Sequence, residues 1–152
     1  TAYNETCAAI SMVYLFERMF LLHGESKYIE CMERTLYNGV ISGMSMDGGR
    51  FFYPNPLSSD GKYKFNADGN TTRQPWFGCA CCTSTLSRLL PSLPRHLYSV
   101  KDNTLLLTLF SSTQLPIHPD HTIIHIHYQY YTLNLTSYRY RRSTPYFHTL
   151  PT

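Results

Sequence analysis

Three cysteines lie within four positions, at Cys79, Cys81 and Cys82, and a fourth thiol, Cys7, follows Glu5 by two residues near the start of the chain. Residues two apart point to the same side of an extended segment, so Glu5 and Cys7 could act together. Thiolates and carboxylates bind borderline-soft cations such as zinc. The spacing therefore predicts a tetrahedral metal site made of Glu5, Cys7, Cys81 and Cys82.

The cysteine pattern leaves other interpretations open. It lacks the paired Cys-x-x-Cys knuckles of a zinc finger, so spacing alone favours a metal site no more than a metal-free thiol. Disulfide stapling is disfavoured, because five cysteines are an odd number and adjacent Cys81 and Cys82 pair poorly. Both precede a helix expected to begin near Thr83 or Ser84, whose N-terminus would stabilise a thiolate. Cys31 is more typical of a small buried apolar residue.

Helices in the first third of the chain must position Glu5 and Cys7. Residues 8–22 are nearly all apolar and are followed by Gly24, which predicts a largely buried helix. A second helix is expected after Ser26, because apolar residues then recur at helical spacing as far as Ile41. Gly43 marks its expected end.

Glu33 lies among the apolar positions of that second helix, one turn from Ile29 and Tyr37. A buried carboxylate needs a partner or a purpose. A structural hydrogen bond and a carboxylate that faces a substrate cavity are equally open interpretations.

The rest of the chain reads as loops and then strands. Glycines and prolines around short aromatic runs predict loops with brief strands at residues 50–53 and 62–65. A short helix over residues 84–90 follows the cysteines, with Pro91 and Pro94 ending it. Two runs, 98–100 and 104–110, then predict a hairpin. We expect a helical domain over residues 1–97 and the start of a β-domain over 98–152.

The composition changes after Ser111. Five of the seven histidines and six of the 13 tyrosines lie beyond it, whereas lysine is absent. We assign no fold to residues 132–152, and we expect residues 112–152 to be atypical or poorly ordered. A frame change or truncation would explain the shift.

Charge and hydropathy exclude several classes of function. A net charge of +3 with scattered basic residues, apart from Arg139, Arg141 and Arg142, argues against nucleic acid as a partner. The longest apolar runs are shorter than the roughly 20 residues needed to cross a bilayer, so no membrane association is expected. Thr1 is neither an initiator methionine nor part of a signal peptide, so we expect the chain to begin within a longer protein.

Four segments together resemble glycoside hydrolase family 127, whose members are zinc-dependent β-L-arabinofuranosidases with a cysteine nucleophile. Their order and spacing along residues 1 to about 110 carry the resemblance more than any one of them. The segments are Tyr3–Ala8 (YNETCA), Glu33–Gly39 (ERTLYNG), Phe52–Leu57 (FYPNPL) and Trp76–Cys82 (WFGCACC).

The resemblance implies a role for each marked residue. It places a zinc ion on Glu5, Cys7, Cys81 and Cys82, makes Cys81 the catalytic nucleophile, and makes Glu33 and Tyr53 substrate contacts. The implied reaction is retaining hydrolysis through a thioglycosyl intermediate, which releases L-arabinofuranose from glycans. Arabinofuranosyl-containing oligosaccharides or glycans are the implied partners.

The resemblance also implies a fold that this chain holds only in part. The expected fold class is mainly α with a C-terminal β part, namely the C-terminal portion of an (α/α)6 barrel that leads into a β-sandwich-type domain. The family's acid/base glutamate lies upstream of the Glu-Thr-Cys motif, so we expect the chain to be inactive alone. The missing N-terminal part of its own barrel is then a partner, and a soluble protein of a bacterial cytoplasm or periplasm is expected.

Two alternatives belong to other classes of function. A non-catalytic, zinc-stabilised carbohydrate-binding or structural module would keep the metal without an activated thiolate. A thiol redox protein would use Cys79 and Cys81 instead. Stoichiometric zinc that survives mild oxidant without disulfide formation would exclude the redox protein.

Overall fold

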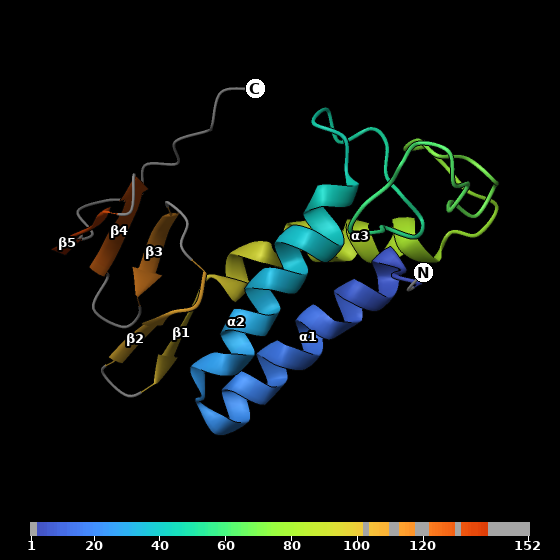
Figure 1. The fold of residues 1–152 in the computed structure, drawn as a ribbon. Helices are drawn as coiled ribbons and strands as arrows, with labels where there is room; N and C mark the ends of the chain where they lie inside the picture. The colour runs from blue at the N-terminus through green and yellow to red at the C-terminus, as the bar shows by residue number, and fades with distance from the viewer. Residues whose placement is uncertain (1–2, 102–103, 110–112, 118–121, 130–131, 140–152) are drawn as a thin grey trace. The chain divides into compact units, whose positions relative to one another are not determined.

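A computed structural model describes residues 3–101, 104–109, 113–117, 122–129 and 132–139. The described residues form two compact units, with the division between Leu109 and Phe110. The first unit is mainly helical with a small two-stranded sheet at its end (Figure 1).

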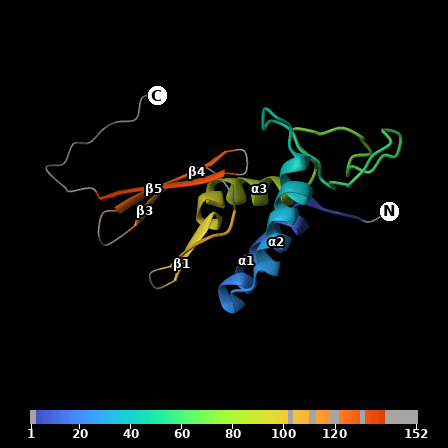
Figure 2. The ribbon, with the colours of Figure 1, turned by 60° about the vertical axis from the view of Figure 1, so that its left-hand side comes forward.

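Two antiparallel helices form the body of the first unit. Helix α1 spans Thr6–His23, and Gly24 ends it in the left-handed conformation at φ 70°, which glycine adopts without strain. Helix α2 spans Ser26–Thr35 and continues through a π-helical turn, η1 (Leu36–Val40), and a 3-10 turn, η2 (Ile41–Gly43). Both views show α1 and α2 lying side by side along their lengths (Figures 1 and 2).

The two helices approach closely at their metal-site end. A Cβ added at Gly39 in η1 would stand 3.1 Å from Cβ of Ala9 in α1, so a larger residue would push the two elements apart. The sequence therefore places its smallest residue at the tightest crossing.

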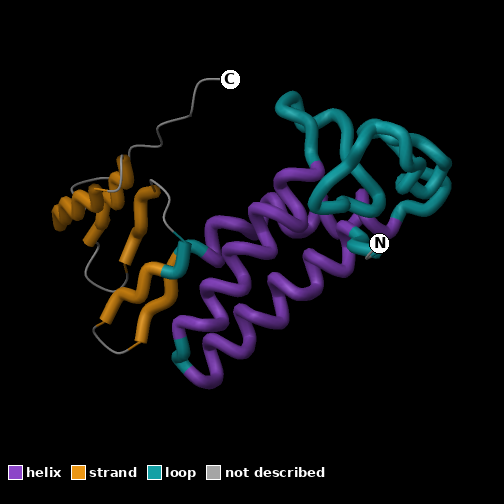
Figure 3. The backbone as a smooth tube through the Cα atoms, viewed as in Figure 1, coloured by secondary structure: helices purple, strands orange, loops and turns teal. Residues whose placement is uncertain are grey.

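A long loop region, residues 44–80, connects η2 to the next helix at one end of the pair (Figure 3). The expected strands at residues 50–53 and 62–65 are not formed. Phe51 makes isolated bridges to Met44 and Gln74, and Pro54 makes one to Glu5. Single bridges replace strands because glycines and prolines interrupt every run before a ladder can extend.

Helix α3 spans Cys81–Ser92 and is followed by a 3-10 turn, η3 (Leu93–His96). It begins before the expected residues 83–84, and Pro91 lies inside its last turn instead of ending it. The expected hairpin is confirmed as β1 (Tyr98–Lys101) and β2 (Thr104–Leu107), which pair antiparallel.

The second unit contains an antiparallel sheet in the order β3-β4-β5. The strands are β3 (Thr113–Ile117), β4 (Thr122–Gln129) and β5 (Thr132–Arg139). Strand β5 lies within residues 132–152, to which the sequence assigned no fold, although residues 132–136 alternate between polar and apolar side chains. Residues 140–152 lie outside the described part, and the atypical character of residues 112–152 stays a prediction.

The core of the first unit lies between α1, α2 and α3. Ile10, Val13, Met32, Val40 and Leu89 are fully enclosed or nearly so. Helix α1 is less buried than expected, since Leu15, Leu21 and Leu22 are exposed. By length and composition α1 could also cross a membrane, which the sequence analysis did not foresee. Ile10 and Val13 of α1 pack into this core, and the absence of membrane association stays a prediction.

Candidate metal centre

Glu5 and Cys7 lie on either side of the start of α1. Glu5 is the N-cap residue in an extended conformation, and its carbonyl accepts the first intrahelical hydrogen bond, from Ala9 at 3.0 Å. Cys7 is already in the first turn of the helix, so the pair is not extended throughout as expected. The two side chains nevertheless converge, because Cys7 Sγ donates to Glu5 Oε1 at 2.7 Å.

Cys81 and Cys82 are the first two residues of α3, whereas the sequence placed them before it. Their thiols therefore lie where unpaired backbone N–H groups and the helix dipole favour anions, as the sequence argument required. Cys82 is fully buried, Cys81 is half-buried and Cys79 is exposed.

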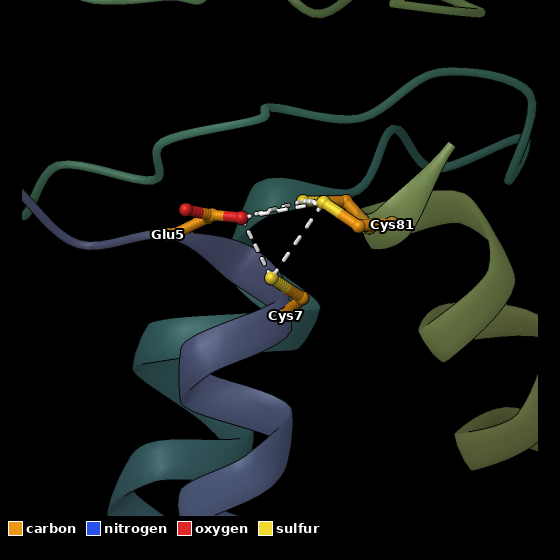
Figure 4. Close-up of side chains that lie close together, drawn as sticks. Glu5, Cys7 and Cys81 are labelled. Carbon is orange, nitrogen blue, oxygen red and sulfur yellow. Dashed lines mark hydrogen bonds between the residues drawn. The ribbon is translucent and has the colours of Figure 1, made fainter. Parts of the chain in front are cut away.

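The folded chain brings together the four residues that the sequence predicted as ligands (Figure 4). One ligand atom from each residue lies within 4.8 Å of all the others. Glu5 Oε1 accepts from Cys81 Sγ at 3.3 Å and lies 3.9 Å from Cys82 Sγ. The Cys81 sulfur lies 3.8 Å from that of Cys7 and 3.9 Å from that of Cys82.

These separations match a tetrahedral cation site. Thiolates bound at about 2.3 Å to one tetrahedral ion lie about 3.8 Å apart. The two sulfur–sulfur distances given above agree with that edge length, and Glu5 supplies an oxygen at the fourth corner. The Glu5 oxygen lies 2.7 Å from Cys7 Sγ, closer than two ligands of one tetrahedral zinc ion, so the cluster could hold a metal ion if these two atoms moved apart.

Hydrogen bonds and burial shift the pKa values of three of the four cluster residues. The hydrogen bond from the Cys7 thiol, followed by those from Cys81 and Tyr3, lowers the pKa of Glu5 and keeps it a carboxylate. Burial, and then the hydrogen bond to Glu5, raises the pKa of Cys7. Burial raises the pKa of Cys82 to about 12. A dicationic metal would reverse this balance by displacing the thiol protons.

Tyr53 reaches the cluster from the loop region. Its hydroxyl lies 2.9 Å from Cys81 Sγ. The hydrogen bond to Cys81 is the main cause that raises the pKa of Tyr53, so the phenol stays protonated and can donate to a thiolate. Its ring packs edge-on against buried Phe77, with ring centroids 5.6 Å apart.

Three residues that the sequence did not single out position Tyr53 and Glu5 through hydrogen bonds. The Thr6 hydroxyl donates to the Phe52 carbonyl at 2.8 Å, and the Thr6 N–H donates to the Tyr53 carbonyl at 2.9 Å. Asn66 accepts the Tyr53 N–H at 2.9 Å. Tyr3 donates to Glu5 Oε2 at 3.1 Å. Only Tyr3 had a sequence signal, since it precedes Glu5 by two residues in an extended segment.

Glu33 and Cys31 differ from their predicted surroundings. Glu33 is half-buried on α2, and its carboxylate makes no hydrogen bond among the described residues. It therefore does not join the cluster, and its role as a substrate contact stays a prediction. Cys31 is exposed, so its interpretation as a buried apolar residue was wrong.

Comparison with known proteins decides the family. Residues 1–95 match the family model described as "Beta-L-arabinofuranosidase, GH127 catalytic domain". The chain belongs to glycoside hydrolase family 127. The matched range includes all four cluster residues and Tyr53.

Relatives in glycoside hydrolase family 127 are much longer than this chain. A non-reducing end β-L-arabinofuranosidase of Bifidobacterium longum subsp. longum is 36% identical over 105 residues, which are 67% of this chain and 16% of that protein. A solved structure of a β-arabinofuranosidase of the family is 51% identical, with a TM-score of 0.72, over 85% of this chain and 19% of that one. A β-L-arabinofuranosidase from Geobacillus stearothermophilus T6 is 38% identical, with a TM-score of 0.76, over 91% of this chain and 23% of that one.

Proposed function

We propose that this chain supplies the nucleophile side of the active site of a retaining glycoside hydrolase that releases L-arabinofuranose from glycans. The observation that carries the proposal is the meeting of Glu5, Cys7, Cys81 and Cys82, whose ligand atoms all lie within 4.8 Å of one another, with the Tyr53 hydroxyl on Cys81. The family match supports the sugar specificity.

Zinc is the metal that this donor set favours. Three sulfurs and one carboxylate oxygen in a tetrahedral arrangement suit zinc better than the harder magnesium or calcium ions, which prefer six or more oxygen ligands. A bound zinc ion would keep the three thiols deprotonated and fix the orientation of Cys81.

Cys81 is the nucleophile in this proposal, because it carries the phenol contact, which half-buried Cys7 lacks, and because Cys82 is fully enclosed. Its sulfur lone pair forms a bond to the anomeric carbon, and the glycosidic carbon–oxygen bond breaks with its electron pair on the leaving oxygen. That oxygen takes a proton from a general acid. Water then attacks the same carbon, the carbon–sulfur pair returns to Cys81, and the water proton goes back to the acid/base.

Tyr53 has two roles in this scheme. Its hydroxyl donates to the Cys81 thiolate and so orients the attacking sulfur. The same phenol borders the place where the sugar must sit, which makes Tyr53 a substrate contact. Glu33 is a second proposed substrate contact, and it depends on the resemblance alone.

The whole catalytic domain is a further part of the proposal. We expect the helices described here to be the C-terminal part of an (α/α)6 barrel, with the strands after residue 97 leading into a β-sandwich-type domain. The resemblance places the acid/base glutamate outside this chain, so the 152 residues alone should not hydrolyse arabinofuranosides.

Turnover by a serine variant tests the proposal. Cys81→Ser, made in a protein that joins this segment to a complete catalytic domain, should lose more than about a thousandfold in kcat on an aryl β-L-arabinofuranoside. Cys31→Ser is the matched control, because Cys31 is exposed and lies outside the four-residue cluster. Near-normal turnover by Cys81→Ser would contradict the role of Cys81 as the nucleophile. The non-catalytic zinc module would then be the remaining interpretation of this segment.

A further inference from the structure

A groove of about 710 Å³ opens beside the metal cluster, between the N-terminal segment and the loop after Tyr53. Tyr3 forms one wall, and Pro54, Leu57 and Tyr63 form others. This volume is in the range of sites that hold small ligands.

Two phenol rings in this groove expose most of their surface. Tyr3 is 68% exposed and Tyr63 is 58% exposed. The electron-rich faces of aromatic rings pack against the C–H faces of sugar rings. The groove therefore offers stacking surface for a sugar.

The groove is continuous with the metal cluster. Tyr3 lines the groove and donates to Glu5, a cluster residue, at 3.1 Å. Pro54 lines the groove, forms a bridge with Glu5 and follows Tyr53, whose hydroxyl contacts Cys81. A molecule whose reacting bond lies at Cys81 would thus find the groove next to the Glu5 side of the site.

Polar groups at the far wall suit a neutral polyol. Asp60 Oδ1 accepts the backbone N–H groups of Lys62 and Tyr63, each at 2.9 Å. These hydrogen bonds lower the pKa of Asp60 and keep it ionised. Its other oxygen accepts no hydrogen bond among the described residues, so it is available to a sugar hydroxyl.

We infer that this groove binds the second sugar ring of the glycan, the one that leaves when the arabinofuranosyl residue is released, with Tyr63 as its stacking platform. The inference rests on the proposed function, in which the arabinofuranosyl ring lies at Cys81. A second hollow of about the same volume, lined by Met12, Arg34 and Arg73, has no lining side chain that hydrogen-bonds a cluster residue, so it is not chosen.

Binding of two sugars to the zinc-loaded 152-residue chain tests the inference. Calorimetry should show that a β-L-arabinofuranosyl disaccharide binds at least about fivefold more tightly than methyl β-L-arabinofuranoside. Tyr63→Ala should abolish that difference, whereas Tyr63→Phe, which keeps the ring, should retain it. Tyr37→Ala is the matched control, because Tyr37 is an exposed tyrosine that does not line the groove.

Equal affinity for the two sugars, absence of disaccharide binding, or an unchanged difference in Tyr63→Ala would overturn the inference. Transfer of magnetisation from the disaccharide to the Tyr63 ring protons gives a second readout that does not depend on the variant folding. The turnover of Cys81→Ser decides the proposed function separately, so failure of the groove leaves that result unaffected.

Discussion

At the scale of single residues, the carboxylate of Glu5 connects the cluster. The thiols of Cys7 and Cys81 both donate to its Oε1 atom. Because the pKa of Glu5 is lowered and those of Cys7 and Cys82 are raised, Glu5 can bind a metal as a carboxylate, whereas Cys7 and Cys82 must first lose their thiol protons.

Metal uptake should therefore depend steeply on pH. The raised pKa values of Cys7 and Cys82 mean that these two thiols are protonated at neutral pH, so each of them releases one proton when it binds a metal. Apparent zinc affinity should rise by about tenfold per pH unit for each proton released, and weaken as pH falls. Competition with a chromophoric chelator at pH 6, 7 and 8 measures this slope. Cys31→Ser should leave the slope unchanged, and a pH-independent affinity would contradict the account.

The same geometry predicts one preferred disulfide. Cys7 and Cys81 have sulfurs 3.8 Å apart on different helices, whereas Cys81 and Cys82 are sequence neighbours, which pair with strain. Mild peroxide should therefore join Cys7 to Cys81 in metal-free protein, and prior zinc loading should prevent it. Peptide mapping without reduction identifies the bond. A dominant Cys79–Cys81 bond in the zinc-loaded protein would instead favour the redox alternative.

The sequence predicted which four residues form the cluster better than it predicted the residues that support them. Glu5, Cys7, Cys81 and Cys82 were identified because metal chemistry restricts residue types and spacing. Thr6 and Asn66 were missed, since a buried threonine or asparagine that satisfies a loop carbonyl or N–H has no local pattern. Glu33 was placed correctly on its helix, but periodicity could not show whether the face it lies on would be covered.

At the scale of elements, a buried pair links α1 to the turn after α3. His96 Nδ1 lies 2.6 Å from Glu17 Oε1, and the His96 side chain is fully buried. The His96 ring also lies against Tyr14, with centroids 5.7 Å apart. This contact helps fix the angle between the two helices whose N-terminal ends carry the four ligands.

Removing the pair should destabilise the fold without removing a ligand. Glu17→Ala leaves a buried imidazole nitrogen without its partner, which should cost about 1–3 kcal/mol in the free energy of unfolding. Urea denaturation measures the loss, and zinc stoichiometry should stay the same. Glu25→Ala is the control, because the Glu25–Lys27 pair is exposed and should contribute little. Equal stability of Glu17→Ala and the unaltered chain would refute this role.

Helices were predictable because their periodic apolar residues and stop signals are local. The end of α1 at Gly24 and the hairpin around residues 102–103 follow from such signals. The early start of α3 was missed, since Cys81 and Cys82 have no helical preference of their own and the cluster contacts place them there. The strands expected within residues 44–80 were predicted wrongly, because the aromatic runs there make single bridges and core contacts instead of extended strand pairs.

At the scale of the whole molecule, the described helices leave apolar surface uncovered. Met12, Leu15 and Leu22 on α1 are 40%, 49% and 76% exposed. The chain spans 16% to 23% of the relatives compared above. We propose that the rest of an (α/α)6 barrel covers this face in the complete catalytic domain.

The isolated chain should consequently self-associate through this face. Leu15→Gln with Leu22→Gln should shift the mass measured by light scattering toward that of a monomer, because the double variant removes two exposed leucines from α1. Met46→Gln, at a fully exposed loop position, should not change the mass. A monomeric unaltered chain at micromolar concentration would contradict the proposal.

The central claim is that Cys81 is a metal-activated nucleophile aimed at an arabinofuranosyl ring. The most direct measurement is mass-spectrometric mapping after the zinc-loaded chain reacts with a bromoacetamide of β-L-arabinofuranosylamine, with the glucose-configured reagent as control. The account predicts one adduct, on Cys81, formed faster with the arabinose reagent and reduced by Tyr53→Phe. Labelling of exposed Cys31 or Cys79 ahead of Cys81, or equal rates with both reagents, would contradict it.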